Sequence, residues 1–162
     1  MRAGTDRRDG RMDIMAFLPG ELTIRQGDTV VWYADHPMPH SVTFPAAGGG
    51  EPAFVQIQLP DGRLIDAPEP GEPIPPEVAM LMADPATAPR LVLGPGGRAV
   101  RPSPNYDGRS LYNSGLIGDH PGIQIPLPQV WMLTFDRPGS FEYMCVIHDP
   151  LGMEGKITVT PR

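Results

Sequence analysis

The chain has one cysteine, four histidines and no long apolar run among its 162 residues. A single cysteine excludes an internal disulfide, so cysteine content says nothing about the redox compartment. Without an apolar run of about 20 residues, the sequence predicts no transmembrane segment. Acidic residues outnumber basic ones, and the formal net charge is -6. This charge disfavours nucleic acid and anionic membranes as partners and favours a protein partner with a basic patch.

Length and composition predict a single domain of the all-β class. A chain of 162 residues, 40% of them hydrophobic, is long enough for one core and too short for two ordinary domains. Its 22 prolines and 19 glycines predict frequent turns, and apolar residues alternate with polar ones near both ends. We therefore expect a flexible tail over residues 1–10 and one β domain over 11–162. A Pro/Gly-rich insertion over 46–112 interrupts that domain.

Short alternating segments separated by turn residues predict the strands. The strands lie at 12–17, 21–25, 29–33 and 129–135, with turns at 19–20, 26–28 and 136–139. Such a meander is typical of a β-sandwich. Inside the insertion, 54–59 and 63–65 flank a Pro-Asp-Gly turn and predict a hairpin. Residues 76–83 begin with proline followed by an acid and predict a short helix, and 90–93 predict another strand.

The residues with the most distinctive chemistry gather near the C-terminus, in the spacing Cys145-x2-His148-x4-Met153. Residues 141–145 and 156–159 alternate in polarity and predict two half-buried strands on either side of a tight loop. Cys145 therefore ends a strand and points inward, and a glycine-containing turn lets Met153 reach the same place. A thiolate, an imidazole and a thioether are soft and borderline donors that suit copper.

The fourth ligand is expected to be His40. Pro37 and Pro39 hold this histidine in a rigid segment, and the strand-like residues Val42 and Phe44 follow it. Two histidines and one cysteine in a trigonal arrangement, with a distant axial methionine, are the ligand set of a blue-copper electron-transfer centre.

This pattern resembles the plastocyanin-like cupredoxins over about residues 11–45 and 111–160. The most specific element is the Cys-x2-His-x4-Met loop followed by Gly-Lys-Ile-Thr-Val at 155–159. The resemblance implies a Greek-key β-sandwich that binds one type 1 copper ion per chain and acts as a one-electron carrier, Cu(II)/Cu(I), rather than as an enzyme. The ligands that it implies are His40, Cys145, His148 and Met153.

Position 41 departs from the family pattern. Plastocyanins usually carry an asparagine after the first ligand histidine, and its side chain helps to tie the ligand loops together. This chain has Ser41 instead. The resemblance therefore leaves open the hydrogen bonds around the ligands and the reduction potential, whereas the ligand set is unaffected.

The position of His148 on a loop leads us to expect that its edge reaches the surface. The apolar residues expected to form a collar around it are Pro37, Met38, Pro39, Pro150 and Leu151. Redox proteins such as a cytochrome or a copper oxidase would dock there transiently. The resemblance also implies a periplasmic or extracellular protein whose signal peptide or anchor is absent from this sequence.

An enzyme is the first alternative, as a copper-oxidase or nitrite-reductase-type subunit. In those families a histidine beside the ligand cysteine connects the blue copper to a catalytic copper, whereas Met144 and Val146 flank Cys145 here. Four histidines are also too few for a three-copper cluster. A binuclear purple centre needs two bridging cysteines and is excluded.

The second alternative is a copper carrier or sensor, in which methionines of the insertion would assist metal exchange. Met80 and Met82, on the predicted helix, are instead expected to pack in a core. His36 and His120 are expected to face solvent. A catalytic copper shared between subunits, or a second weak metal site, is the alternative for these two histidines.

Overall fold

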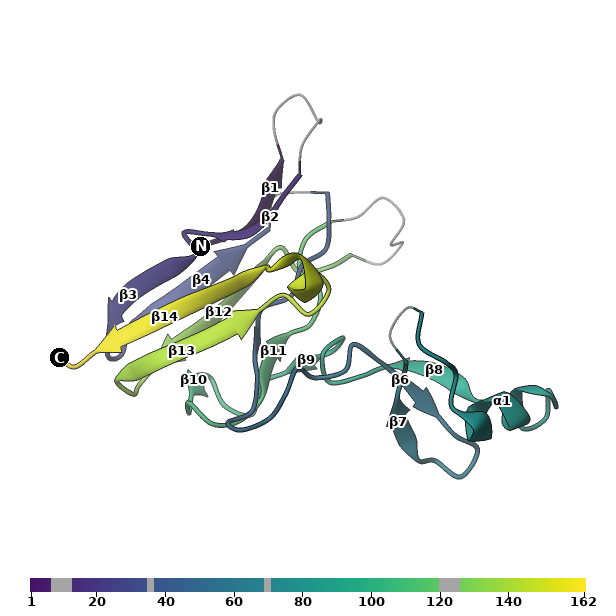
Figure 1. Cartoon of the computed structure of the whole chain (residues 1–162). Coiled ribbons are helices and arrows are strands. Elements are labelled where there is room, and N and C mark those ends of the chain that lie inside the picture. The colour runs from purple at the N-terminus through teal and green to yellow at the C-terminus, as the bar shows by residue number, and fades with distance from the viewer. Residues whose placement is uncertain (7–12, 35–36, 69–70, 120–125) are drawn as a thin grey trace.

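The computed structural model describes residues 1–6, 13–34, 37–68, 71–119 and 126–162 (Figure 1). Figure 1 shows two sheets at the centre of the molecule and a smaller lobe, coloured teal, to one side of them. No helix in these described segments is both long and apolar enough to span a membrane.

The first sheet has the strand order β10-β12-β4-β1-β2. Its strands are β10 (Asn105–Tyr106), β12 (Val130–Phe135), β4 (Thr29–Tyr33), β1 (Arg2–Asp6) and β2 (Asp13–Leu18). Val30 and Trp32 of β4 are buried, and the alternating residues Thr29, Val31 and Tyr33 are exposed. This is the pattern of a strand with one face on a core and the other in water.

The second sheet has the strand order β3-β14-β13-β5-β11-β9. Its strands are β3 (Glu21–Arg25), β14 (Glu154–Thr160), β13 (Gly139–Met144), β5 (Thr43–Phe44), β11 (Tyr112–Ser114) and β9 (Ala99–Val100). Thr43 of β5 pairs with Met144, the last residue of β13. The segment that follows His40 therefore lies beside the strand that leads to Cys145.

Aromatic rings from both sheets meet in one core. Trp32 of the first sheet contacts Phe44 and Tyr143 of the second, with ring centroids 6.0 and 5.5 Å apart. Phe44 and Tyr143 stack on each other at 5.0 Å. All three side chains are buried. The two sheets thus pack face to face, and the predicted all-β sandwich is confirmed.

The N-terminal tail expected over residues 1–10 is wrong for residues 2–6, which form β1. This strand pairs antiparallel with β2 and parallel with β4, and the backbone N–H of Tyr33 donates to the carbonyl of Met1 at 3.0 Å. Ala3 and Gly4 are both buried. The neighbouring strands satisfy the backbone hydrogen-bonding groups of β1 on both sides. The strand contains no large apolar side chain, so its sequence carries no apolar pattern that predicts a strand. Residues 7–10 lie outside the described residues.

The lobe is built from the middle of the predicted insertion. Its sheet has the order β7-β6-β8, from β6 (Val55–Gln58), β7 (Leu64–Asp66) and β8 (Arg90–Leu93), and its helix is α1 (Pro76–Met82). The predicted hairpin is confirmed, because β6 and β7 pair antiparallel with Ile57 opposite Ile65. The predicted short helix is confirmed as well. Ile57, Leu59 and Val78 form a small separate core under the helix.

The insertion ends earlier than residue 112. β9 pairs with β11 of the second sheet, and β10 pairs with β12 of the first, so both short strands belong to the sandwich. Prolines surround these two-residue strands and masked their pairing in the sequence.

The expectation that Met80 and Met82 pack in a core is wrong. Their exposed fractions are 77% and 58%. α1 has only seven residues, and its buried face is supplied by Val78 together with the half-buried Leu81, three residues further on. The two methionines therefore lie on the remaining, solvent-facing surface.

Candidate metal centre

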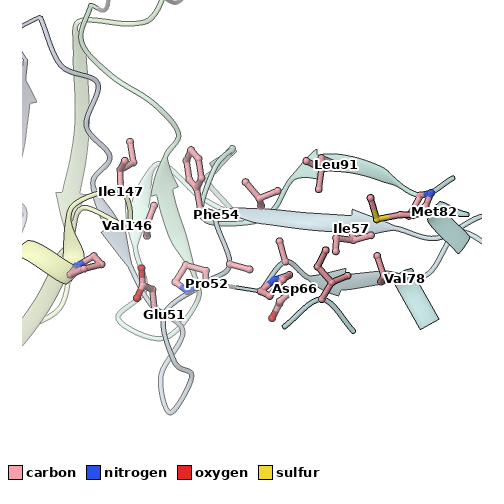
Figure 2. A pocket seen from close by; sticks show the side chains of 17 residues that line it. Glu51, Pro52, Phe54, Ile57, Asp66, Val78, Met82, Leu91, Val146 and Ile147 are labelled. Carbon is pink, nitrogen blue, oxygen red and sulfur yellow. The ribbon is translucent and has the colours of Figure 1, made fainter. Parts of the chain in front are cut away.

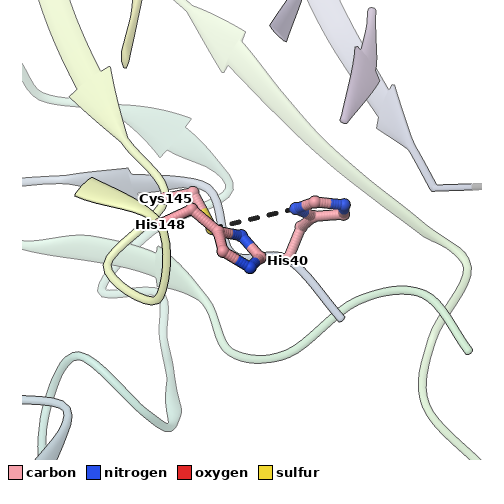
Figure 3. A group of neighbouring side chains, drawn as sticks. All are labelled: His40, Cys145 and His148. Carbon is pink, nitrogen blue, oxygen red and sulfur yellow. Dashed lines mark hydrogen bonds between the residues drawn. The ribbon is translucent and has the colours of Figure 1, made fainter. Parts of the chain in front are cut away.

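Three of the four predicted ligands, His40, Cys145 and His148, lie close together in the structure. The Sγ of Cys145 is 3.4 Å from Nδ1 of His148 and 4.0 Å from Nδ1 of His40 (Figure 3). All three residues are buried, and their donor atoms lie within 4.8 Å of one another. Figure 3 shows Cys145 and His148 on the same loop, with His40 approaching from a different segment of the chain.

Backbone hydrogen bonds close the loop that carries Cys145 and His148. The N–H of His148 donates to the carbonyl of Cys145 at 2.9 Å, and the N–H of Cys145 donates to the carbonyl of Met153 at 3.0 Å. Between them, 149–151 form a 3-10 helix that ends at Gly152, whose φ of 76° is in the left-handed region that favours glycine. The predicted turn therefore brings Met153 back beside Cys145.

His40 is held from two sides. Its N–H and C=O both bond to the backbone of Ile117, each at 2.8 Å, in an isolated antiparallel bridge. Gly4 of β1 lies against its ring, because a Cβ built on Gly4 would fall 2.7 Å from Cε1 of His40. Gly4 has a φ of 69° and sits where the β1–β2 register shifts between Ala3 and Thr5. This bulge lets the backbone approach the imidazole more closely than a side chain would allow.

Ser41 joins the two ligand segments through both its backbone and its side chain. Its backbone N–H donates to Sγ of Cys145 at 3.2 Å, and its hydroxyl oxygen accepts the N–H of Val146 at 3.0 Å. The hydroxyl also lies 3.2 Å from that of Thr43. Ser41 thus ties the two ligand-bearing segments together, which answers the open question about the hydrogen bonds around the ligands.

Replacing Ser41 with alanine is expected to lower the free energy of unfolding by about 1–3 kcal/mol, because the buried N–H of Val146 loses its acceptor. Thr43→Val is the matched control, since it removes the neighbouring hydroxyl and leaves the bond to Val146 intact. Urea unfolding of both variants measures the difference. Equal losses of stability in the two variants would show that the hydrogen bond from Val146 to Ser41 contributes no more than the contact between the two hydroxyl groups.

Burial raises the pKa of the Cys145 thiol, and the backbone N–H groups of Ser41, Ile147 and His148 counteract this by favouring the thiolate. A thiol in this position is therefore a neutral, buried group until a cation binds, and metal coordination deprotonates it.

The donor set fits a trigonal transition-metal ion. An ion about 2.0 Å from an imidazole nitrogen and about 2.3 Å from a thiolate sulfur places these two donors about 3.7 Å apart when the angle is trigonal. The two sulfur–nitrogen separations of 3.4 and 4.0 Å bracket that value. Among the described residues, this is the one group of three or more His, Cys, Asp or Glu side chains that could hold a metal ion.

Met153, the remaining predicted ligand, is completely buried and belongs to the same core cluster as Cys145. Its place as an axial donor stays a prediction. The exposed edge expected for His148 is small, since only 6% of the residue is accessible. In the expected collar, Pro37, Pro150 and Leu151 are exposed, whereas Met38 and Pro39 are half-buried. His36 and His120 lie outside the described residues.

Sequence reasoning missed Gly4 and Ile117, which position His40. Gly4 lies in the stretch expected to be a tail, and no local signal marks it, because its contact with His40 depends on the pairing of β1 in the sheet.

No protein-family model matches the chain, and no curated protein matches it. The solved structure of an amicyanin mutant with Cu(I) aligns with 87% of this chain and 70% of its own, at 19% identity and a TM-score of 0.40.

Plastocyanin structures give similar values. A mutant plastocyanin of fern aligns with 91% of this chain and 90% of its own, at 17% identity and a TM-score of 0.41. The oxidised form of plastocyanin from Dryopteris crassirhizoma gives the same coverage and TM-score at 16% identity. At identities of 16–19% and TM-scores of 0.40–0.41, these similarities assign the chain no function.

Proposed function

We propose that this chain binds one copper ion in a type 1 (blue) centre and carries single electrons between redox proteins. The observation that supports this most directly is the buried cluster of His40, Cys145 and His148, with donor atoms within 4.8 Å of one another. Two imidazoles and a thiolate, with a methionine buried beside them, are the donors of blue-copper sites.

The chain's own residues would hold the metal and limit its movement. His40, Cys145 and His148 would hold the ion with two imidazoles and a thiolate, and Met153 would add a thioether. Bound copper supplies the one-electron Cu(II)/Cu(I) couple. Because the sulfur donors favour Cu(I) and the imidazoles accept both states, the donor set can hold copper in either oxidation state. The hydrogen bonds from Ser41 and within the ligand loop keep the donors in place, and burial keeps water away from them.

The electron would leave through the edge of His148. Leu151 and Pro150 present exposed apolar surface close to this histidine in the chain, and Leu151 is 68% exposed. We propose that the partner, a protein such as a cytochrome or a copper oxidase, docks on this collar. A small apolar contact suits an encounter that must form and dissociate quickly.

A copper carrier or sensor is the second candidate function. The exposure of Met80 and Met82 favours it, because thioethers on a solvent-facing helix are available to a metal in transit. An oxidase-type subunit has no comparable support. The described residues contain no second cluster of His, Cys, Asp or Glu that could bind a catalytic metal.

A single metal-binding experiment separates these functions. Protein loaded with Cu(II) would be cycled between ascorbate and ferricyanide in the presence of a Cu(I) chelator, and its copper content measured after each cycle. An electron carrier retains one copper per chain and exchanges electrons with added cytochrome c. Loss of copper to the chelator would favour the carrier, and tight binding of a second equivalent would favour the enzyme.

Met153→Gln is expected to lower the reduction potential while the intense blue absorption remains. The amide oxygen is a harder donor than the thioether and therefore stabilises Cu(II) relative to Cu(I). Met153→Leu, which has no donor, is the matched variant and is expected to shift the potential upwards. Cyclic voltammetry measures both shifts. Two unchanged potentials would remove Met153 from the ligand set.

The place of this protein in the cell follows from the same proposal. We propose a periplasmic or extracellular location, as the resemblance to plastocyanin-like cupredoxins implies. Fractionation of cells that express the native gene tests this directly.

A further inference from the structure

A large pocket lies between the lobe and the metal-ligand loop. It has a volume of about 830 Å³, within the range of pockets that bind small molecules. Figure 2 shows Val146 and Ile147, from the ligand loop, at one end of it, and Val78 and Met82, from α1, at the other. Phe54 lies between them. The pocket therefore joins the inserted lobe to the region of the metal centre.

The pocket is lined by apolar side chains that the small core of the lobe does not bury. The fully buried core of the lobe consists of three side chains. In contrast, the pocket-lining residues Ile74, Met82 and Leu91 are 51%, 58% and 74% exposed. Large apolar side chains gathered in one hollow, and not scattered singly over the surface, are typical of a binding site.

The charged groups among the described residues of the pocket have one sign. Glu51 and Asp66 line it, and no Lys, Arg or His is among these described lining residues. The amide of Gln56 donates to one oxygen of Asp66 at 2.9 Å and so orients that carboxylate. Figure 2 shows Glu51 beside the ligand loop and Asp66 further along, on the lobe. This charge pattern complements a cation and repels an anion.

We propose that this pocket binds a small amphipathic cation, with its apolar body against Phe54, Val78 and Leu91 and its ammonium group near Glu51 or Asp66. This goes beyond the proposed function and does not depend on it, because binding requires no metal. Val146 lies directly after Cys145, and Ile147 directly before His148. A cation bound in the pocket therefore contacts the loop that carries Cys145 and His148, two of the predicted copper ligands. The NMR signals of Val146 and Ile147 should report this binding.

Three probes with one apolar body test the proposal: 4-phenylbutylamine, 4-phenylbutanol and 4-phenylbutyrate. Metal-free, reduced protein with labelled methyl groups would be titrated with each probe while the NMR shifts of Val78, Val146 and Ile147 are followed. The amine is expected to give saturable shifts at all three residues. Its affinity should exceed that of the alcohol by about two- to fivefold, because an exposed carboxylate contributes up to about 1 kcal/mol. The carboxylate probe should bind more weakly still.

Matched variants separate this pocket from general surface effects. Glu51→Gln with Asp66→Asn should abolish the preference for the amine, whereas Asp61→Asn with Glu77→Gln, exposed acids of the lobe outside the pocket, should preserve it. Leu91→Ser should weaken all three probes, whereas Leu64→Ser, which is exposed and does not line the pocket, should not. Absence of saturable shifts, equal affinities for amine and carboxylate, or equal effects of the two acid pairs would each overturn the proposal.

Discussion

Replacing Gly4 with alanine is expected to lower the free energy of unfolding by about 2–5 kcal/mol and to weaken Cu(II) binding by about tenfold or more. An alanine in the left-handed region costs about 1–2 kcal/mol, and overpacking a buried site costs about 1–3 kcal/mol more. The added methyl group would overlap the ring of His40 and displace it. Loss of a contact that orients a metal ligand typically costs about 10–100-fold in affinity.

Gly48 provides a matched control. Its φ of 73° is close to that of Gly4, at 69°, but nothing lies within 4 Å of a Cβ built on it. Gly48→Ala should therefore show the conformational cost alone, with unchanged metal affinity. Urea unfolding and competition for Cu(II) with a chelator measure both quantities. If the two variants behaved alike, β1 would have no part in positioning His40.

Replacing Phe44 with alanine is expected to lower the free energy of unfolding by about 3–5 kcal/mol, the usual cost of truncating a buried aromatic residue. Its ring is completely buried and lies 4.7 Å from that of Tyr106 and 5.0 Å from that of Tyr143, between centroids. The loss is a large part of the total stability of an ordinary domain, about 5–15 kcal/mol. Because β5 also carries the chain from His40 towards β13, metal binding should weaken together with stability.

Phe54→Ala is the comparison variant. Phe54 is half-buried in the lobe and lines the pocket, so its truncation should cost less stability and leave the metal affinity of the sandwich unchanged. Denaturant unfolding followed by near-UV circular dichroism compares the two. A smaller loss for Phe44→Ala than for Phe54→Ala would mean that the core is centred elsewhere.

The ligand loop could be predicted from the sequence because its determinants are local. Period-2 alternation around Cys145 and along β14, together with the glycine-containing turn, is sufficient to place Cys145, His148 and Met153 on one tight loop. The structure brings Cys145 and His148 together as expected, with His40 beside them. The same local patterns located β3 and β4, whose flanking turns contain glycine.

What the sequence could not provide are contacts between distant segments. Gly4 meets His40 only because β1 pairs in parallel with β4, and no local pattern encodes that pairing. Ser41 bonds to Val146, 105 residues away, through a hydroxyl that any exposed serine also has. The elements of the lobe could be predicted but its pocket could not, because the pocket is formed by side chains from α1, β8 and the ligand loop, which become neighbours only in the folded chain.

The most direct measurement of the central claim is the visible absorption and electron paramagnetic resonance spectrum of the protein with one equivalent of Cu(II), recorded for the native chain and for Cys145→Ser. The account predicts an intense thiolate-to-copper charge-transfer band and narrow hyperfine splitting in the native protein. Both should disappear on mild reduction and be absent from the variant. A pale spectrum with broad splitting that is the same in both proteins would contradict the ligand set of His40, Cys145 and His148, and with it the blue-copper centre.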